Sequence, residues 1–261
     1  MNGLTGLSTR RLLLKSLLPA LILGYYALAT RNHWLNPRIW VTPGQIWHAA
    51  AGLNRDGFLW LAVGESLLRD LIGFTLGTAS GLLIGGALGL SRWADRLGTP
   101  TLHFLKAIAI FAWIPMLTMF FGIGELSKIV FIALSAFYPV ALNTLEGIRS
   151  VPPSQRELAR VYRLNPWQRL KKVIAPSALP SILTGIQLAL ILTWLSTVGV
   201  EYFMSAGPSI GGILLNGAES FHLDLVFIGV ILLGGIGFAL DQLAHGVGRH
   251  LLRNRPQTLN A

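Results

Sequence analysis

The sequence predicts an all-α integral membrane protein with about six transmembrane helices. Of its 261 residues, 52% are hydrophobic and only 12% are charged, and the mean hydropathy is +0.58. Soluble domains carry about 25% charged residues. Long apolar runs alternate with short basic segments, which is typical of helices that cross a bilayer. The net charge of +10 therefore indicates membrane topology and not nucleic-acid binding.

The first predicted span is the apolar run of residues 17–29, which follows a basic segment that begins at Arg10. A cleaved signal peptide is the alternative, because residues 27–29 have the A-x-A form of a cleavage site. We favour a retained span with its basic end inside. Residues 30–65 contain four tryptophans among prolines and glycines, which suits the membrane–water interface. This part of the chain is therefore expected to be an outer loop.

The second predicted span, residues 66–90, carries a glycine at every fourth position. This spacing places the glycines on one helix face, where the absence of side chains lets another backbone approach closely. We expect the face to pack against another helix of the chain or of a second copy. Direct contact with a transported solute is the alternative. The five positions are Gly73, Gly77, Gly81, Gly85 and Gly89.

The third predicted span, residues 101–121, follows a short basic turn at residues 91–99. Pro115 lies inside this span and leaves one backbone carbonyl without its helical partner, so we expect it to kink the helix. Two roles stay open for the kink, which either is purely structural or shapes a transport path.

The fourth predicted span, residues 129–148, follows a tight turn at residues 122–127 and contains Pro139 and Asn143. A side-chain amide inside a bilayer needs a partner from another helix or from water in a cavity, because lipid offers none. Asn143 is therefore expected either to bond a neighbouring helix or to line a transport path.

A polar and basic insert, Glu146–Pro180, separates the fourth span from the fifth. It holds seven of the 21 Lys and Arg residues, so we expect it in water beside the membrane. Ser154 and Glu157 have the spacing of a capping box, which predicts that a first short helix begins at Ser154. The side chains that this helix is expected to expose besides Glu157 are those of Ala159, Val161 and Tyr162.

A second short helix is predicted within the same insert. Asn165 suits the N-cap, Pro166 the first helical position and Gln168 the third, where it can complete a capping box. Pro176 and Pro180 are then expected to interrupt the helix before the fifth span begins. The insert is therefore predicted to be a helix-turn-helix hairpin.

The fifth and sixth predicted spans, residues 182–203 and 225–243, are joined by an irregular outer loop in which a short interfacial helix is expected. Glu201 lies ~28 Å along the fifth span at 1.5 Å per residue. We therefore expect its carboxylate at the far membrane interface, in contact with water.

The distribution of Lys and Arg predicts the orientation of the chain. Fifteen of the 21 fall in the segments assigned to one side, namely residues 1–16, 91–100, 147–180 and 245–261, and four fall on the other side. Cytoplasmic loops carry the excess of positive charge. Both termini and the insert are therefore predicted to be cytoplasmic.

The sequence lacks the motifs of several functional classes. It has no Cys, its six His residues have no metal-binding spacing, and it contains neither a nucleophile-elbow motif nor a G-x-x-x-x-G-K-[ST] loop for ATP. We therefore expect no catalytic residue, no metal and no cofactor in this chain. An ATP-driven transporter would need a partner ATPase.

Two other classes of membrane protein fit the sequence less well. A secondary transporter or channel that works without ATP predicts ionisable residues in mid-span, whereas Asp70 and Lys106, the nearest candidates, lie near the predicted span ends. A passive membrane anchor would need neither the glycine face nor two capped cytoplasmic helices.

The insert and its flanking spans resemble a known family. Glu157-Leu158-Ala159, Arg163 and Val173–Pro176 resemble the "EAA" signature of inner-membrane permeases in binding-protein-dependent ABC importers. Further segments resemble the sulfonate, taurine and nitrate branch over residues 15–255, among them Gly89–Trp93, Phe137–Pro139 and Trp194 with Glu201. The chain departs from the pattern at Leu158 (Ala in the family), Arg163 (Gly), Ala175 (Leu) and Ala109 (Pro).

This resemblance implies a type I ABC-importer permease that takes up a small anion such as an alkanesulfonate, taurine or nitrate. It implies three partners in a bacterial inner membrane: a cytoplasmic ABC ATPase dimer that carries ATP and magnesium, a second permease copy, and a periplasmic or lipid-anchored substrate-binding protein. It also implies a permease core at residues 66–255 with a coupling loop at 146–180, preceded by residues 1–65 and followed by a cytoplasmic tail at 256–261.

The resemblance also implies roles for single residues. Pro115, Asn143 and Glu201 would line or gate the transport path. Because Arg163 stands where the family has Gly, we expect a changed turn in which Leu164 or Asn165 takes the left-handed conformation. The residues implied to couple the permease to the ATPase are Ser154, Glu157, Ala159, Arg160, Val161, Tyr162 and Arg163.

Overall fold

The computed structural model describes residues 41–252, in which every regular element is a helix. The predicted all-α fold is thus confirmed. The first predicted span, with its signal-peptide alternative, and the tail at 256–261 lie outside the described residues. The elements are α2 (Pro43–Arg55), α3 (Phe58–Leu90), α4 (Arg92–Ala107), η1 (Ile110–Trp113), α5 (Ile114–Phe121), α6 (Glu125–Arg149), α7 (Pro153–Val161), α8 (Pro166–Arg169), η2 (Leu170–Ile174), α9 (Ala175–Phe203), α10 (Ile210–Glu219) and α11 (Leu223–Leu252).

Four segments between residues 41 and 252 are long and apolar enough to cross a membrane: Phe58–Leu90, Glu125–Arg149, Pro166–Phe203 and Leu223–Gly246. The helix pair Arg92–Ala107 and Ile110–Phe121, bent by 96°, would add a fifth. These segments correspond to the second to sixth predicted spans, and all five begin earlier than predicted.

The described residues form two units. The smaller comprises residues 41–59 and 213–229, and the larger comprises residues 60–212 and 230–252. In the smaller unit α2 begins with a capping box, in which the Gln45 amide donates to the Thr42 hydroxyl and the Thr42 amide to the Gln45 side chain. The larger unit holds the glycine face, the insert and the residues discussed below.

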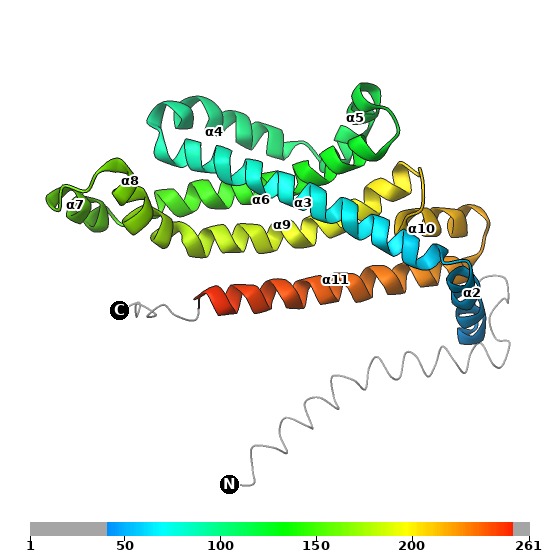
Figure 1. Cartoon of the computed structure of the whole chain (residues 1–261). Helices are drawn as coiled ribbons and strands as arrows, with labels where there is room; N and C mark the ends of the chain where they lie inside the picture. The colour runs from blue at the N-terminus through cyan, green and yellow to red at the C-terminus, as the bar shows by residue number, and fades with distance from the viewer. Residues whose placement is uncertain (1–40, 253–261) are drawn as a thin grey trace, which may run out of the picture. The chain divides into compact units, whose positions relative to one another are not determined.

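The glycine face of α3 lies against α6 (Figure 1). A Cβ atom at Gly77 would lie 2.2 Å from the carbonyl oxygen of Ala133, and one at Gly85 would lie 2.3 Å from that of Ala141. Cβ atoms at the three other positions would meet Ile132, Phe137 or Ile148 within 3 Å. The four-residue spacing therefore produces the close helix contact within this chain that it predicts.

Helices α6 and α9 lie side by side over much of their length (Figure 1). Two further glycines make this possible, because a Cβ atom at Gly185 would lie 2.6 Å from the Cβ of Asn143 and one at Gly147 would lie 2.9 Å from that of Ser181. The Ser181 hydroxyl donates to the Asn143 carbonyl oxygen at 2.8 Å. Helix α6 is therefore held between α3 and α9.

The third predicted span differs from the expectation in two ways. The predicted turn at 91–99 is the first part of α4, because the Ser91 hydroxyl caps the helix by accepting from the Ala94 amide. The break lies at Ile108 and Ala109, before η1, and not at Pro115. Pro115 stands in the first turn of α5, where its missing amide hydrogen removes no helical bond. The expected kink at Pro115 is therefore wrong.

The fifth predicted span is longer than expected because the prolines do not stop it. Helix α9 begins at Ala175 and continues through Pro180. Pro176 directly follows the π turn η2, in which the Ala175 amide donates to the Leu170 carbonyl, and its missing amide hydrogen does not end the helix. One π turn, η2, joins α8 to α9, so that the segment Pro166–Phe203 is helical throughout. The predicted interruption by Pro176 and Pro180 is wrong.

Candidate functional site

The insert is a hairpin of the two helices α7 and α8. We call it the cytoplasmic hairpin (residues 153–169), after the side of the membrane that the distribution of Lys and Arg predicts for it. Helix α8 begins as predicted, since the Gln168 amide donates to Asn165 Oδ1 at 2.7 Å and the Asn165 amide donates to Gln168 Oε1 at 3.2 Å. Helix α7 does not begin as predicted. Its N-cap is Pro152, Pro153 is its first residue, and no side chain caps it. The expected capping box of Ser154 and Glu157 is therefore wrong, because two prolines start the helix earlier.

The turn after α7 contains Arg163 in the left-handed conformation, with φ of 49°. The Leu164 amide donates to the Ala159 carbonyl at 3.0 Å and the Arg163 amide to the Arg160 carbonyl at 2.9 Å. These two bonds form a Schellman motif, whose left-handed position is usually Gly. Our expectation that Leu164 or Asn165 would take this conformation is wrong, since the two hydrogen bonds require the left-handed conformation at Arg163.

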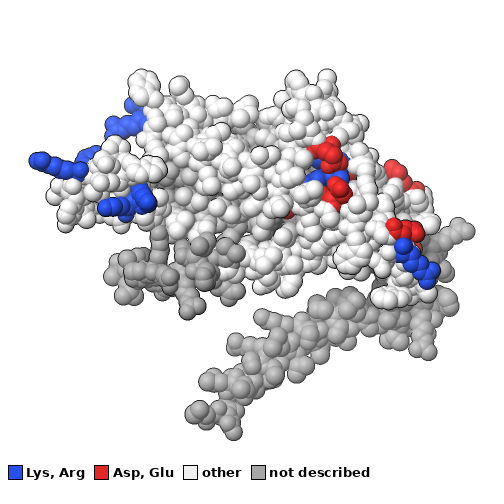
Figure 2. Space-filling model, viewed as in Figure 1, with Lys and Arg blue, Asp and Glu red and all other residues white. Residues whose placement is uncertain are grey.

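The hairpin presents an exposed apolar surface, which we call the α7 surface: Leu158, Val161 and Tyr162, with exposed fractions of 57%, 77% and 70%. Glu157 is exposed beside it. Ala159 was expected on this surface but is buried, so the expectation is wrong for this residue. Its side of α7 faces the rest of the hairpin, and Leu158 supplies the exposed apolar side chain instead. Figure 2 shows Lys and Arg side chains gathered over this end of the larger unit.

Two hydrogen bonds connect α7 to the long helices. Arg156 Nη2 donates to the carbonyl oxygen of Ile148 at 2.7 Å, near the end of α6. The Ser177 hydroxyl, near the start of α9, donates to Gln155 Oε1 at 2.8 Å. Because both contacts come from one short rigid helix, a displacement of α7 would pull on α6 and α9 together.

The same two long helices line a cavity of about 500 Å³, together with the broken segment between α4 and η1. We call it the central cavity. Its polar lining consists of Lys106, Ser135, Tyr138, Asn143, Glu146 and Ser196. The Ser135 hydroxyl shares a hydrogen bond of 2.7 Å with the Ser196 hydroxyl, and Asn143 Nδ2 donates to the Pro139 carbonyl at 2.8 Å.

Helix α6 therefore has two different faces. One face packs against the glycines of α3 and is apolar. The other face, which carries Ser135, Tyr138, Asn143 and Glu146, lines the central cavity. Polar groups in a membrane helix usually face the protein interior or a water-filled cavity and mark solute pathways. The central cavity is thus the candidate transport path.

The three residues predicted to line or gate the path do not lie together. Asn143 lines the central cavity, whereas Pro115 and Glu201 are not among its lining residues. Glu201 was expected in contact with water at the membrane interface, but its side chain is fully buried. That expectation is wrong, because polar groups of α3 and of the loop before α10 surround the carboxylate.

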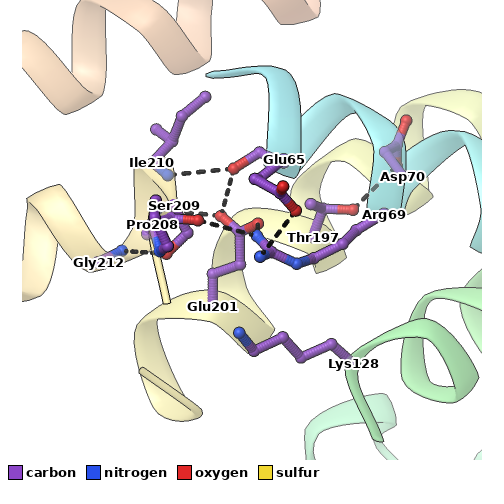
Figure 3. A network of polar contacts seen from close by, with 12 residues as sticks. Glu65, Arg69, Asp70, Lys128, Thr197, Glu201, Pro208, Ser209, Ile210 and Gly212 are labelled. Atoms are coloured by element: carbon purple, nitrogen blue, oxygen red, sulfur yellow. Dashed lines mark hydrogen bonds and ion pairs between the residues drawn. The ribbon is translucent and has the colours of Figure 1, made fainter. Parts of the chain in front are cut away.

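Glu201 belongs to a cluster of charged and polar groups, most of them buried, which we call the ion cluster (Figure 3). Arg69 Nη1 pairs with Glu201 Oε1 at 3.0 Å, and the other carboxylate oxygen accepts from the Ser66 hydroxyl at 2.8 Å and the Gly211 amide at 3.1 Å. Arg69 Nη1 also donates to the Pro208 carbonyl at 3.2 Å. Three donors, namely Arg69 Nη1, the Ser66 hydroxyl and the Gly211 amide, therefore compensate the burial of the Glu201 carboxylate.

Two more carboxylates complete the ion cluster. Glu125, at the start of α6, pairs with Arg69 Nε and, at 3.3 Å, with Lys128 Nζ. Glu65 pairs with Arg69 Nη2 at 3.4 Å, and both acidic side chains are partly exposed, at 40% and 52% for Glu65 and Glu125. Lys128 is fully buried and also donates to the Ala206 carbonyl. The cluster thus connects α3, α6, α9 and the loop that leads to α10.

Sequence reasoning missed most members of the ion cluster. Arg69 had a usable signal, since an arginine within an apolar span needs a buried partner. Its partners Glu125 and Glu201 gave no such signal, because they lie 56 and 132 positions away in the chain. Taken singly, each has the sequence context of a carboxylate at the membrane interface.

The chain is similar to known transport proteins. The family described as "binding-protein-dependent transport system inner membrane component" matches residues 77–253. The putative aliphatic sulfonates transport permease protein SsuC of Escherichia coli (strain K12) is 36% identical over 239 residues, which cover 92% of this chain and 90% of that protein. The bicarbonate transport system permease protein CmpB of Synechococcus elongatus is 32% identical and covers 78% and 72%. The taurine transport system permease protein TauC of Escherichia coli (strain K12) is 31% identical and covers 75% and 71%.

Solved structures share the fold. An inward-facing conformation of the MetNI methionine ABC transporter aligns with a TM-score of 0.58 at 22% identity, covering 73% of this chain and 96% of that chain. An amino acid ABC transporter crystallised with histidines aligns with a TM-score of 0.65 at 15% identity, covering 77% and 97%. About three quarters of the chain thus shares the fold of ABC transporter permeases.

Proposed function

Because this chain belongs to the family of inner membrane components of binding-protein-dependent transport systems, as the resemblance predicted, we propose which solute it moves and how. The chain is the permease subunit of an ABC importer and is a transport component. Its solute is a small anion such as an alkanesulfonate, taurine or nitrate. Relatives named for sulfonates, bicarbonate, nitrate and taurine support this class.

The observation that carries the mechanism is the connection between the cytoplasmic hairpin and the central cavity. Helix α7 is hydrogen-bonded to the end of α6 and to the start of α9, and these helices line the cavity. A partner that pushes on α7 would therefore change the spacing of the cavity walls. Lys106 supplies a cation for an anionic solute, and Glu146, which also lines the cavity, keeps the site from holding the anion tightly.

The partners follow from this proposal. An ABC ATPase dimer, which carries the ATP and the magnesium, docks on the α7 surface in the cytoplasm, and a substrate-binding protein delivers the anion on the other side. A second copy of the chain completes the path. Both termini lie in the cytoplasm, because 15 of the 21 Lys and Arg residues fall in the segments on that side.

The test is uptake into proteoliposomes that contain the permease together with its partner ATPase and substrate-binding protein. We expect uptake of at least one labelled anion among taurine, alkanesulfonate and nitrate, and only with ATP. Uptake by the permease alone would favour the ATP-independent transporter or channel. Asn143→Leu places an apolar side chain in the central cavity and should lower uptake severalfold while the complex still assembles, whereas Thr75→Val, on the exposed side of α3, is the control that should leave uptake unchanged.

A further inference from the structure

A second large cavity lies where the cytoplasmic hairpin meets the end of α3. Its volume is about 580 Å³, and its walls include Leu90 at the end of α3, Ile148 near the end of α6, and Arg156, Trp167 and Arg169 of the hairpin. We call it the interfacial cavity. Its volume lies within the range of about 300–1,000 Å³ that is common for small-ligand sites.

Two arginines in this cavity have unused hydrogen-bond donors. The Nε atoms of Arg156 and Arg169 are buried and have no hydrogen-bond partner among the described residues. Arg156 uses Nη2 to hold the Ile148 carbonyl at 2.7 Å, which fixes this guanidinium in place. Since buried donors without a partner are costly, the cavity is suited to a ligand that brings acceptor oxygens.

The positive charge of the lining favours a ligand with negative charge. No Asp or Glu is among the described residues that line the interfacial cavity, whereas two guanidinium groups are. A guanidinium binds phosphate oxygens through two parallel hydrogen bonds, in a geometry that it shares with no other side chain. The lining therefore favours a phosphate group over a neutral or cationic ligand.

The position of the cavity favours a phosphate that belongs to a lipid. Its wall includes the last residue of the membrane-spanning α3, Leu90, which is half exposed, and Trp167, whose side chain is 70% exposed. Tryptophan is enriched at the membrane–water boundary. The rest of the wall is apolar, with Leu164, Leu170 and Ile174. The cavity thus combines a cationic pole with apolar walls at the level where a lipid headgroup meets its acyl chains.

We propose that the interfacial cavity binds the headgroup of an anionic phospholipid of the cytoplasmic leaflet, with Arg156 and Arg169 on its phosphate. Basic pockets between membrane helices on the cytoplasmic side bind lipids of this kind. The bound lipid would brace the hairpin against the end of α3. This site is separate from the central cavity and from the α7 surface, so it does not depend on which solute is imported.

Native mass spectrometry of the full chain, purified in detergent and titrated with phosphatidylglycerol or phosphatidylcholine, tests the proposal. We expect phosphatidylglycerol to bind roughly tenfold more tightly, which corresponds to about 1.4 kcal/mol. Arg169→Gln should lower that affinity about tenfold, as the loss of a charged hydrogen bond does. Arg160→Gln is the matched control, because this arginine lies on α7 and is exposed but does not line the cavity.

Each contrary result overturns the proposal in a distinct way. Equal affinities for the two lipids, or an equal loss in both variants, would show that the cavity does not recognise the headgroup. Competition by inorganic phosphate at the same concentration as phosphatidylglycerol would show a free-anion site. Release of the lipid on addition of the ATPase would assign the arginines to that partner. Arg169→Gln is used alone because Arg156 also holds α6, and all readouts are independent of transport.

Discussion

The cytoplasmic hairpin and the ion cluster are both polar, but they are held together in opposite ways. In the hairpin the helix caps and the turn use hydrogen bonds between residues three to five positions apart. In the ion cluster Arg69 and Ser66 contact groups 56 to 144 positions away. The hairpin can therefore keep its own shape when it is moved, whereas the cluster fixes several long helices relative to one another. Helix α9 connects the two regions, with Ser177 near one end and Glu201 near the other.

The largest effect is expected where the ion cluster is broken. Arg69→Leu leaves the fully buried Glu201 carboxylate without its cationic partner, and breaking a buried pair in this way costs about 3–5 kcal/mol. We expect most of the folded protein to be lost, measured as the monodisperse fraction after solubilisation. Glu65→Gln is the control, since its pair with Arg69 is partly exposed at 3.4 Å and such pairs contribute about 0–1 kcal/mol. Equal yields of the two variants would contradict a structural role for the cluster.

The second-largest loss of stability is expected at the glycine face, because this face holds α3 against α6, two of the helices that the ion cluster also joins. At Gly77 an added Cβ would lie 2.2 Å from a backbone oxygen of α6, which must move to make room. Overpacking of this kind costs about 1–3 kcal/mol. Gly77→Ala should therefore lower the unfolding temperature in detergent. Gly86→Ala, in the same helix but with no atom within 4 Å of the added Cβ, should leave it unchanged or raise it. Loss of stability in both variants would point to helix flexibility and not to packing.

The sequence predicted what depends on local chemistry or on periodicity. The second to sixth spans, the cap at Asn165 and the helix contact of Gly73–Gly89 follow from spacing alone. The errors occurred where another part of the chain decides the outcome. Pro180 is tolerated because the helix around it is supported by α6, and Glu201 is buried because α3 supplies its partners. The prediction for the start of α7 was wrong for a local reason, since α7 begins at Pro153 after the N-cap Pro152 and does not use the capping box of Ser154 and Glu157.

A smaller effect is expected in the turn of the hairpin, and it tests whether local strain limits this region. Arg163 has φ of 49°, a conformation that costs a non-Gly residue about 1–2 kcal/mol. Arg163→Gly should therefore stabilise the hairpin by about 1 kcal/mol, part of which is offset by the greater flexibility of Gly in the unfolded chain. Limited proteolysis between α7 and α8 would detect the slower local opening. Tyr162→Gly is the control, because Tyr162 has an ordinary φ of −75°, and this variant should accelerate cleavage. If Arg163→Gly also accelerates cleavage, Arg163 makes a contact that compensates its strain.

The smallest effect on stability, and the most informative for mechanism, is expected at Glu157 and Ser154. A capping box would make both residues structural, and Ser154→Ala would then cost ~1 kcal/mol. No side chain caps α7, so neither Ser154→Ala nor Glu157→Gln should change the unfolding temperature measurably.

Glu157 is exposed beside the apolar side chains of Leu158, Val161 and Tyr162, and the chain offers it no ion-pair partner among the described residues. Its carboxylate is therefore free to bind a cation of the ATPase, through a hydrogen bond of the charge-assisted kind. Glu157→Gln should then reduce uptake and substrate-stimulated ATP hydrolysis by roughly tenfold at normal expression, for a bond of about 1.5 kcal/mol, while Ser154→Ala retains both activities. If Glu157→Gln supports wild-type uptake, the coupling contact is made by the apolar side chains alone, and the charge on α7 serves only to keep this surface in water.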